Sequence, residues 1–216
     1  MALCHTYGAG YNPSRESLQI NALNALYTEA RNRLAQVNTA KSALTHAVNH
    51  RQTAYAPLKK LCTRIINALA ACGASGKLVE DARTINRKIQ GKRSRPIAPG
   101  EENHISVSRQ SYDSLAENFS QLLTLVSAEP RYTPNETELQ PERLQTFLES
   151  LGNANTGVRN AYTGYSNALI ARNQLLYEAP DGLVPVALDV KKYVKSLYGS
   201  ASAQYKHLNK IKFRKC

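Results

Sequence analysis

The sequence matches itself when it is shifted by 121 residues, and this internal repeat constrains the fold more than any other feature. Ten of the 41 residues in 11–51 are identical to their counterparts 121 positions later, where chance would give about two or three. The identical pairs include Tyr11/Tyr132, Pro13/Pro134, Leu18/Leu139, Ala40/Ala161 and Arg51/Arg172. We therefore expect 11–93 and 132–216 to be two copies of one unit, joined by 94–131. Coincidence among alanine-rich helices is the alternative.

Apolar residues recur at three- and four-residue steps along most of the chain, which indicates α-helices. The pattern predicts a long helix at about 20–54 and another at 140–178. Shorter helices are expected from Pro57 to Cys72, from Leu78 to Gly91, and at 183–198 and 201–211. One more helix, with Leu115, Phe119, Leu122 and Val126 facing inward, is expected in the joining segment.

These elements predict an all-α fold in a single helical domain over 1–216. It would be a helical bundle built from two copies of a three-helix unit, each with one long and two shorter helices, plus the connecting helix. Only Ile105 to Ser108 alternates like a strand, and four residues without a partner are weak evidence for one.

Small residues recur along both long helices. Their positions are Ala40, Ala43 and Ala47 in the first helix, and Gly157, Ala161, Gly164 and Ala168 in the second. Glycine inside a helix costs about 1 kcal/mol relative to alanine, so its presence favours a close packing contact. We expect the two long helices to cross on these stripes. The alternative is that the stripes meet the shorter helices of their own unit.

Positive charge is concentrated towards the two ends of the chain. The net charge is +12 overall, +11 over 1–100, −6 over 101–182 and +7 over 183–216. Two basic runs, in the last helix of each predicted unit, are the candidate anion-binding residues. They comprise Arg83, Arg87, Lys88, Lys92 and Arg93, and Lys206, Lys210, Lys212 and Arg214. The alternatives are a solvated face, or neutralisation by the acidic middle of the chain.

Motifs of known catalytic chemistry are missing from the sequence. It contains no G-x-S-x-G, glycine-rich phosphate loop, H-E-x-x-H or C-x-x-C. His46 and His50 share a helix face, but a metal site needs more ligands than two. Cys62 and Cys72 are ten residues apart on a helix, too far for a disulfide. We expect no enzymatic activity, no cofactor and no bound metal.

Tyrosine is the dominant aromatic residue, with 12 copies against 3 phenylalanines and no tryptophan. Five lie in the second unit: Tyr162, Tyr165, Tyr193, Tyr198 and Tyr205. Tyrosines beside basic residues can stack on nucleobases. We prefer a position at the core boundary, with the hydroxyl in water, because these tyrosines do not alternate with the basic runs.

Several motifs resemble a group of all-helical bacterial proteins of about this length. They are Tyr132-Thr-Pro-Asn-Glu, Leu176-Tyr177, Gly182-Leu-Val, and Val190-Lys-Lys-Tyr-Val-Lys-Ser-Leu-Tyr-Gly199, together with Ile85-Asn-Arg-Lys-Ile-Gln-Gly-Lys92. The resemblance would cover most of the chain. It implies a helical bacterial protein, and because the group has no assigned function it transfers no site residues.

The leading functional expectation is a non-enzymatic helical interaction or scaffold protein whose partner is another protein or a second copy of itself. The alternative is a nucleic-acid-associated protein that binds phosphates through 83–95 and 206–215. A hydrolase or metal site that assembles only in three dimensions is a third hypothesis. No apolar run is long enough to span a membrane, and the N-terminus does not resemble a secretory signal. We therefore expect a cytoplasmic protein without membrane contact.

Overall fold

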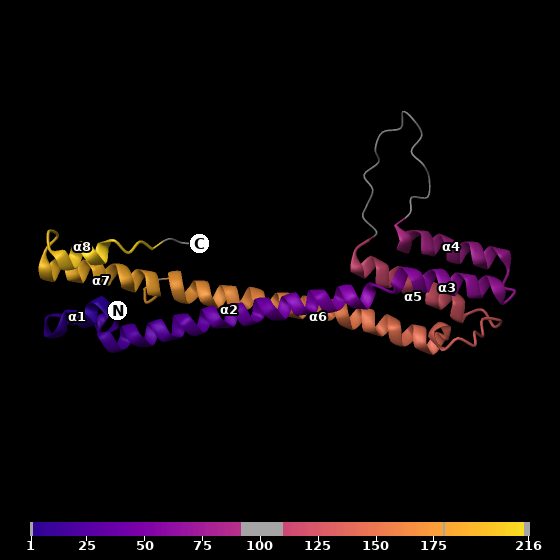
Figure 1. Ribbon diagram of the computed structural model, residues 1–216, viewed down its shortest axis with the longest axis horizontal. Coiled ribbons are helices and arrows are strands. Elements are labelled where there is room, and N and C mark those ends of the chain that lie inside the picture. Colours follow the sequence, from indigo (N-terminus) through magenta and orange to yellow (C-terminus); the bar gives the residue numbers. More distant parts are fainter. Residues whose placement is uncertain (1, 92–109, 179, 214–216) are drawn as a thin grey trace, which may run out of the picture. The chain divides into compact units, whose positions relative to one another are not determined.

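The computed structural model describes residues 2–91, 110–178 and 180–213, and these segments contain helices and no strand. The all-α prediction is confirmed (Figure 1). The helices are α1 (Ala2–Thr6), α2 (Ile20–Tyr55), α3 (Leu58–Ala71), α4 (Gly76–Gln90), α5 (Tyr112–Ser127), α6 (Pro141–Tyr177), α7 (Leu183–Tyr198) and α8 (Ala203–Asn209). Three single 3-10 turns accompany them: η1 (Gly8–Gly10), η2 (Glu16–Leu18) and η3 (Thr137–Leu139). Ile105 to Ser108 lie outside the described residues.

The predicted helices form within a few residues of the expected limits, and local signals explain their ends. Ser75, Ser111 and Ser202 cap the starts of α4, α5 and α8, each accepting a hydrogen bond from a backbone N–H three residues on. Gly91 ends α4 in the left-handed conformation, with φ 75°. Pro57 immediately precedes α3 rather than lying within its first turn. Helix α1 and the 3-10 turns were not predicted.

The chain divides into two compact units whose limits differ from those of the predicted repeats. Unit 1 comprises 1–44 and 161–216, and unit 2 comprises 45–160. Helices α2 and α6 each contribute residues to both units. Each compact unit therefore takes residues from both predicted copies, 11–93 and 132–216. The duplication itself stays a prediction.

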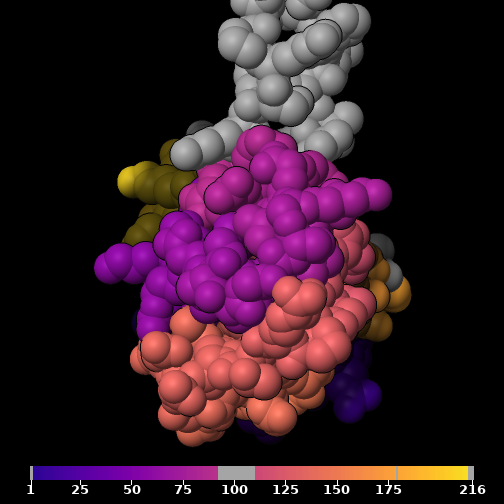
Figure 2. Space-filling model, turned by 90° about the vertical axis from the view of Figure 1, so that its right-hand side faces the viewer, coloured from indigo at the N-terminus to yellow at the C-terminus, as the bar shows by residue number. Residues whose placement is uncertain are grey.

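Unit 2 has its own apolar core, formed by α3, α4, α5 and the start of α6. Its fully buried side chains include Ile65, Leu69, Ile89, Phe119 and Leu144, each 0% exposed. Figure 2 shows this unit from outside, with α3 and α4 (purple to magenta) beside the coral part of the chain that contains η3 and the start of α6. The inward face of α5 is the one predicted from Leu115, Phe119, Leu122 and Val126, which are all buried.

Unit 1 has a smaller core that joins the start of the chain to its end. Cys4, Tyr11 and Leu18 pack with Leu23 against α7 and α8. The contributing residues of those helices are Val186, Val190, Val194 and Leu208. At the edge of this core, the rings of Tyr11 and Tyr193 meet edge to face, 5.3 Å apart. Asp189 accepts hydrogen bonds from Arg15 at 2.7 Å and Lys192 at 2.9 Å.

The segments that lead into the two long helices adopt the same local structure. Before α2, the hydroxyl of Tyr11 donates to the carbonyl oxygen of Leu18 at 2.8 Å, around η2. Before α6, the hydroxyl of Tyr132 donates to the carbonyl oxygen of Leu139 at 3.1 Å, around η3. The two bonds are 121 positions apart, the offset at which the sequence matches itself.

The expected close packing on glycine is wrong. A Cβ atom added to Gly157 or Gly164 would meet nothing within 4 Å, so neither glycine allows a close helix approach. The physical reason is that the small residues of the stripe do not all face inward. Tyr165, half-buried, takes the inward position beside the exposed Gly164, as Leu44 does beside Ala43.

Candidate interaction surface

In the part of the chain that the structure describes, unit 1 exposes large apolar side chains and unit 2 exposes none. Among the described residues, eight such side chains are exposed, and all eight belong to unit 1. They are Tyr27, Leu34, Tyr162, Ile170, Leu188, Leu197, Ile211 and Phe213. Single exposed apolar residues are normal on a protein surface. Their restriction to one unit is therefore the informative observation.

Two of these residues lie on one face of α2. Tyr27 is 48% exposed and Leu34 45% exposed, and seven residues are close to two helical turns, so both point in nearly the same direction. Arg31 lies between them and holds its guanidinium 5.8 Å from the centre of the Tyr27 ring. We call Tyr27, Arg31 and Leu34 the α2 face.

The positions 121 residues later lie on α6 in unit 2, beside α5. Leu148 and Asn155 correspond to Tyr27 and Leu34. Leu148 packs against the core of unit 2, and Asn155 is only 4% exposed. The rings of Phe119 in α5 and Phe147 in α6 meet edge to face, 5.5 Å apart.

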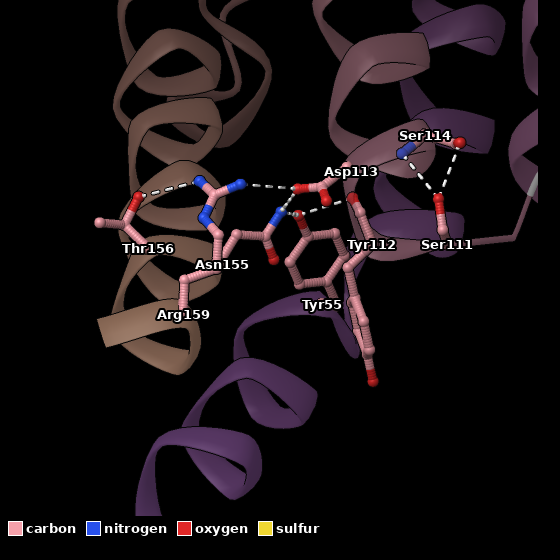
Figure 3. Close-up of polar contacts among 8 residues, drawn as sticks. All are labelled: Tyr55, Ser111, Tyr112, Asp113, Ser114, Asn155, Thr156 and Arg159. Atoms are coloured by element: carbon pink, nitrogen blue, oxygen red, sulfur yellow. Dashed lines mark hydrogen bonds and ion pairs between the residues drawn. The ribbon is translucent and has the colours of Figure 1, made fainter. Parts of the chain in front are cut away.

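A hydrogen-bond network fixes the start of α5 on α6 (Figure 3). The amide nitrogen of Asn155 donates to the hydroxyl of Tyr55 and to a carboxylate oxygen of Asp113, both at 2.9 Å. Tyr55 donates in turn to the backbone carbonyl of Tyr112 at 3.0 Å. Arg159 lies 3.8 Å from the same Asp113 carboxylate. Burial raises the pKa of the Tyr55 hydroxyl, which keeps it a proton donor.

Beside this network lies a shallow groove of about 320 Å³ between α5 and α6. It is lined by Asp113, Ala116, Glu117, Ser120, Leu148, Gly152, Asn155 and Arg159. This lining pairs no Ser, Cys or Lys nucleophile with a histidine base. Among the residues that the structure describes, no three His, Cys, Asp or Glu side chains could together hold a metal ion. His46 and His50 are both exposed.

Two of the three described residues of the first basic run form ion pairs within their own helix. Arg83 and Arg87 of α4 lie 3.6 and 3.1 Å from the carboxylate of Glu80. Arg87 also donates to the hydroxyl of Thr84 at 2.7 Å. Lys88 is half-buried, and Lys92 and Arg93 lie outside the described residues. These ion pairs reduce the charge that α4 offers to an anion.

The second basic run adds positive charge near Lys191 of α7. Lys206 and Lys210 are exposed, as is Lys212, and Arg214 lies outside the described residues. Burial and the positive charge of Lys212 together lower the pKa of the Lys191 ammonium, which stacks over Phe213 at 5.0 Å. The two runs belong to different units: the α4 run to unit 2 and the α8 run to unit 1.

Most of the five tyrosines of the second predicted unit lie at the boundary of a core, as expected from the sequence. Tyr193 and Tyr198 make ring contacts with Tyr11 and Tyr7 at the edge of the unit 1 core, where Tyr205 also packs. Tyr162 is the exception, at 61% exposed. Cys4 and Cys62 are buried free thiols, and Cys72 is half-buried. Cys216 lies outside the described residues.

The sequence pattern did not reveal the α2 face, although a signal was present. Leu34 follows the three- and four-residue spacing of apolar residues that predicts the first long helix, but only the packing of other elements decides whether such a residue is covered. The pattern also missed Asn155, because a polar side chain in an apolar stripe gives no indication of its partners.

In comparison with known proteins, no family model, no curated protein and no solved structure matches this chain. None of the described helices is both long and apolar enough to cross a membrane.

Proposed function

We propose that this protein is a non-enzymatic helical interaction protein that binds another protein through unit 1. The observation that carries the proposal is that the eight large apolar side chains exposed among residues 2–91, 110–178 and 180–213 all belong to that unit. Burial of apolar surface is the main favourable contribution to protein association. Tyrosine, such as Tyr27 and Tyr162 here, is among the usual anchors of such contacts.

Electrostatics support the same unit. Unit 1 contains thirteen basic and five acidic residues, whereas unit 2 contains fifteen basic and eleven acidic residues. A protein partner with an acidic surface would be attracted to the net charge of +8 on unit 1. The apolar contacts would then provide most of the affinity.

Photo-crosslinking in the cells that make the protein tests this proposal. A photoreactive amino acid replaces Leu34 in unit 1 or, as the control, the exposed Gln145 in unit 2. We expect a covalent protein adduct from position 34 and none from position 145. The adduct mass separates a second copy of the chain from a different protein. Equal adduct yields, or none at either position, would contradict the proposal.

The second candidate function is binding of nucleic-acid phosphates. It is favoured by the α8 run, since Lys206, Lys210 and Lys212 are exposed and Lys212 acts electrostatically on Lys191. The α4 run is a weaker candidate because Glu80 pairs with two of its arginines.

Retention on DNA or heparin tests this alternative. If it holds, retention falls steeply between about 50 and 200 mM salt. Reversal of Lys206, Lys210 and Lys212 to Glu should then abolish it, and reversal of Arg83 and Arg87 should reduce it less. Retention that survives the first variant would exclude the α8 run as the site.

A further inference from the structure

A cleft of about 700 Å³ lies within unit 2, between the second half of α3 and the segment that leads into α6. Ala68 and Cys72 line it from α3, and Tyr132 lines it from the segment before α6. Two arginines, Arg64 and Arg131, belong to the same lining. The volume suits a small molecule, since such sites usually measure roughly 300–1,000 Å³.

Unit 1 also packs a helix against the segment before a long helix, so the two units can be compared position by position. In unit 1 the helix is α7, which contacts η2, and in unit 2 it is α3, which contacts η3. The buried residues of these helices include two that are four positions apart. They are Val190 and Val194 in α7, and Ile65 and Leu69 in α3.

An ion pair in each unit supports this register. In unit 1, Asp189 accepts a hydrogen bond from Arg15, which immediately precedes η2, at 2.7 Å. In unit 2, Arg64 donates a hydrogen bond to Glu138, which lies in η3. Asp189 and Arg64 each come directly before the first residue of the buried pair in their helix. The same two elements are therefore joined in both units, with the charges reversed.

The two units differ in the residue that faces the tyrosine of this segment. In α7 that residue is Tyr193, whose ring meets the ring of Tyr11 edge to face at 5.3 Å. In α3 the position directly before the second buried residue is Ala68. Tyr132 holds the place of Tyr11, with the same bond to a carbonyl seven residues further on. Unit 2 thus has a methyl group where unit 1 has a phenol ring, and the cleft is lined by this methyl group and Tyr132.

We propose that the cleft of unit 2 binds a small aromatic carboxylate. Its ring packs between Ala68 and Tyr132, in the place that the Tyr193 ring takes beside Tyr11. Aromatic rings attract one another in this edge-to-face arrangement beyond the gain from burying their surface. The site lies in unit 2 and does not depend on the protein contact proposed for unit 1.

The negative charge of the ligand follows from the two arginines of the lining. Arg64 bonds to Glu138 through one terminal nitrogen of its guanidinium. Arg131 bonds to the backbone carbonyl of Gly73, also through one terminal nitrogen. A guanidinium has five N–H donors, so both side chains retain donors for further oxygens. Carboxylates match this planar donor geometry best among the common groups of small metabolites, together with phosphates.

Titration of the full chain with 4-hydroxyphenylacetate, which joins the ring of a tyrosine to a carboxylate, tests the proposal. Calorimetry should show saturable binding with a Kd below about 1 mM. Two matched compounds test the two recognition elements. para-Cresol lacks the carboxylate and cyclohexylacetate lacks the aromatic ring, and each should bind about fivefold more weakly or worse.

Two further measurements locate the ligand. Alkylation of Cys72, followed by peptide mass spectrometry, should slow when the probe is bound, because this half-buried thiol lines the cleft. Ala68→Tyr fills the cleft with the ring that unit 1 has and should abolish binding. Ala70→Tyr is the matched control, since it adds the same side chain at an exposed position of α3. If Ala68→Tyr fails to fold by circular dichroism, Arg131→Gln replaces it and should weaken binding of the carboxylate but not of para-cresol.

Four outcomes would overturn the proposal. One is the absence of saturable binding at concentrations up to about 5 mM, and another is equal binding by folded Ala68→Tyr and the unmodified chain. Binding that leaves the alkylation rate of Cys72 unchanged would place the probe elsewhere. Equal affinities for 4-hydroxyphenylacetate, para-cresol and cyclohexylacetate would show that neither the ring nor the charge is recognised.

Discussion

Asn155 shows how much of the local structure depends on one polar side chain. It is buried in α6, and its amide nitrogen links Tyr55 at the end of α2 with Asp113 at the start of α5. Its amide oxygen has no hydrogen-bond partner among the described residues. Burial of a polar group costs free energy unless the group is hydrogen-bonded. The two bonds that Asn155 donates therefore offset the cost of burying it among the apolar residues of α6.

Asn155→Ala should destabilise unit 2 by about 1–3 kcal/mol, because two hydrogen bonds of a buried group are lost. The measurement is urea unfolding followed by circular dichroism. Asn153→Ala is the control, since Asn153 also lies in α6 and its side chain is exposed. Equal stabilities of the two variants would show that the network contributes nothing.

The buried hydroxyl of Tyr132 should make the free energy of unfolding fall at alkaline pH. Burial raises the pKa of its hydroxyl from 10.0 to about 12. The folded state therefore favours the protonated form, and this contribution is fully present below pH 10 and is lost as the pH rises towards 12.

Tyr132→Phe tests this pH dependence. At neutral pH the variant should be less stable by about 1 kcal/mol, because the bond to the carbonyl of Leu139 is lost. The difference in unfolding free energy from the unmodified chain should narrow above pH 10, as measured by urea titration at several pH values. If the difference in unfolding free energy stayed constant with pH, the hydroxyl of Tyr132 would have the same pKa in the folded and unfolded states.

At the scale of single elements, helix caps decide the ends of the short helices. Helix α8 has only seven residues, too few to be stable by its own hydrogen bonds. Its start depends on Ser202, whose hydroxyl accepts a bond from the backbone N–H of Tyr205 at 3.2 Å and donates to the carbonyl of Gly199 at 2.8 Å.

Ser202→Ala should therefore fray α8 at a cost of about 1 kcal/mol. Hydrogen exchange should be faster at the backbone amides of α8 and unchanged in α4, which has its own cap at Ser75. Ser200→Ala is the matched control, because Ser200 is exposed and precedes the cap. Faster exchange in both variants would point to the loop rather than the cap.

At the scale of the whole molecule, the two cores are separate sets of residues within one chain. The core of unit 2 contains Leu69, and that of unit 1 contains Val194; both side chains are 0% exposed. Regions with their own buried contacts can open separately, with different free energies.

Leu69→Ala should cost about 2–5 kcal/mol and speed hydrogen exchange mainly in α3, α4 and α5. The reciprocal variant Val194→Ala should act mainly on α7 and α8, at a smaller cost because fewer methyl groups are removed. Exchange that rises equally in both units in either variant would show that the molecule unfolds as one cooperative body.

The sequence alone determined the helices, because apolar spacing, capping serines and glycines act over a few residues. The limits of α7 and the inward face of α5 agree with the pattern for this reason. The offset of 121 also led to two segments that fold alike, around Tyr11 and Tyr132. These features depend on neighbours in the chain, which a sequence displays directly.

Only the tertiary structure decided which segments share a core and which residues stay uncovered. The first and last parts of the chain, 1–44 and 161–216, together form unit 1. The sequence had predicted 11–93 and 132–216 as the two repeated units. Leu148 packs against the core of unit 2, whereas Tyr27 at the matching position is 48% exposed. Burial depends on residues far away in the sequence. Helical periodicity indicates in which direction a side chain points, but not which other segment packs against it.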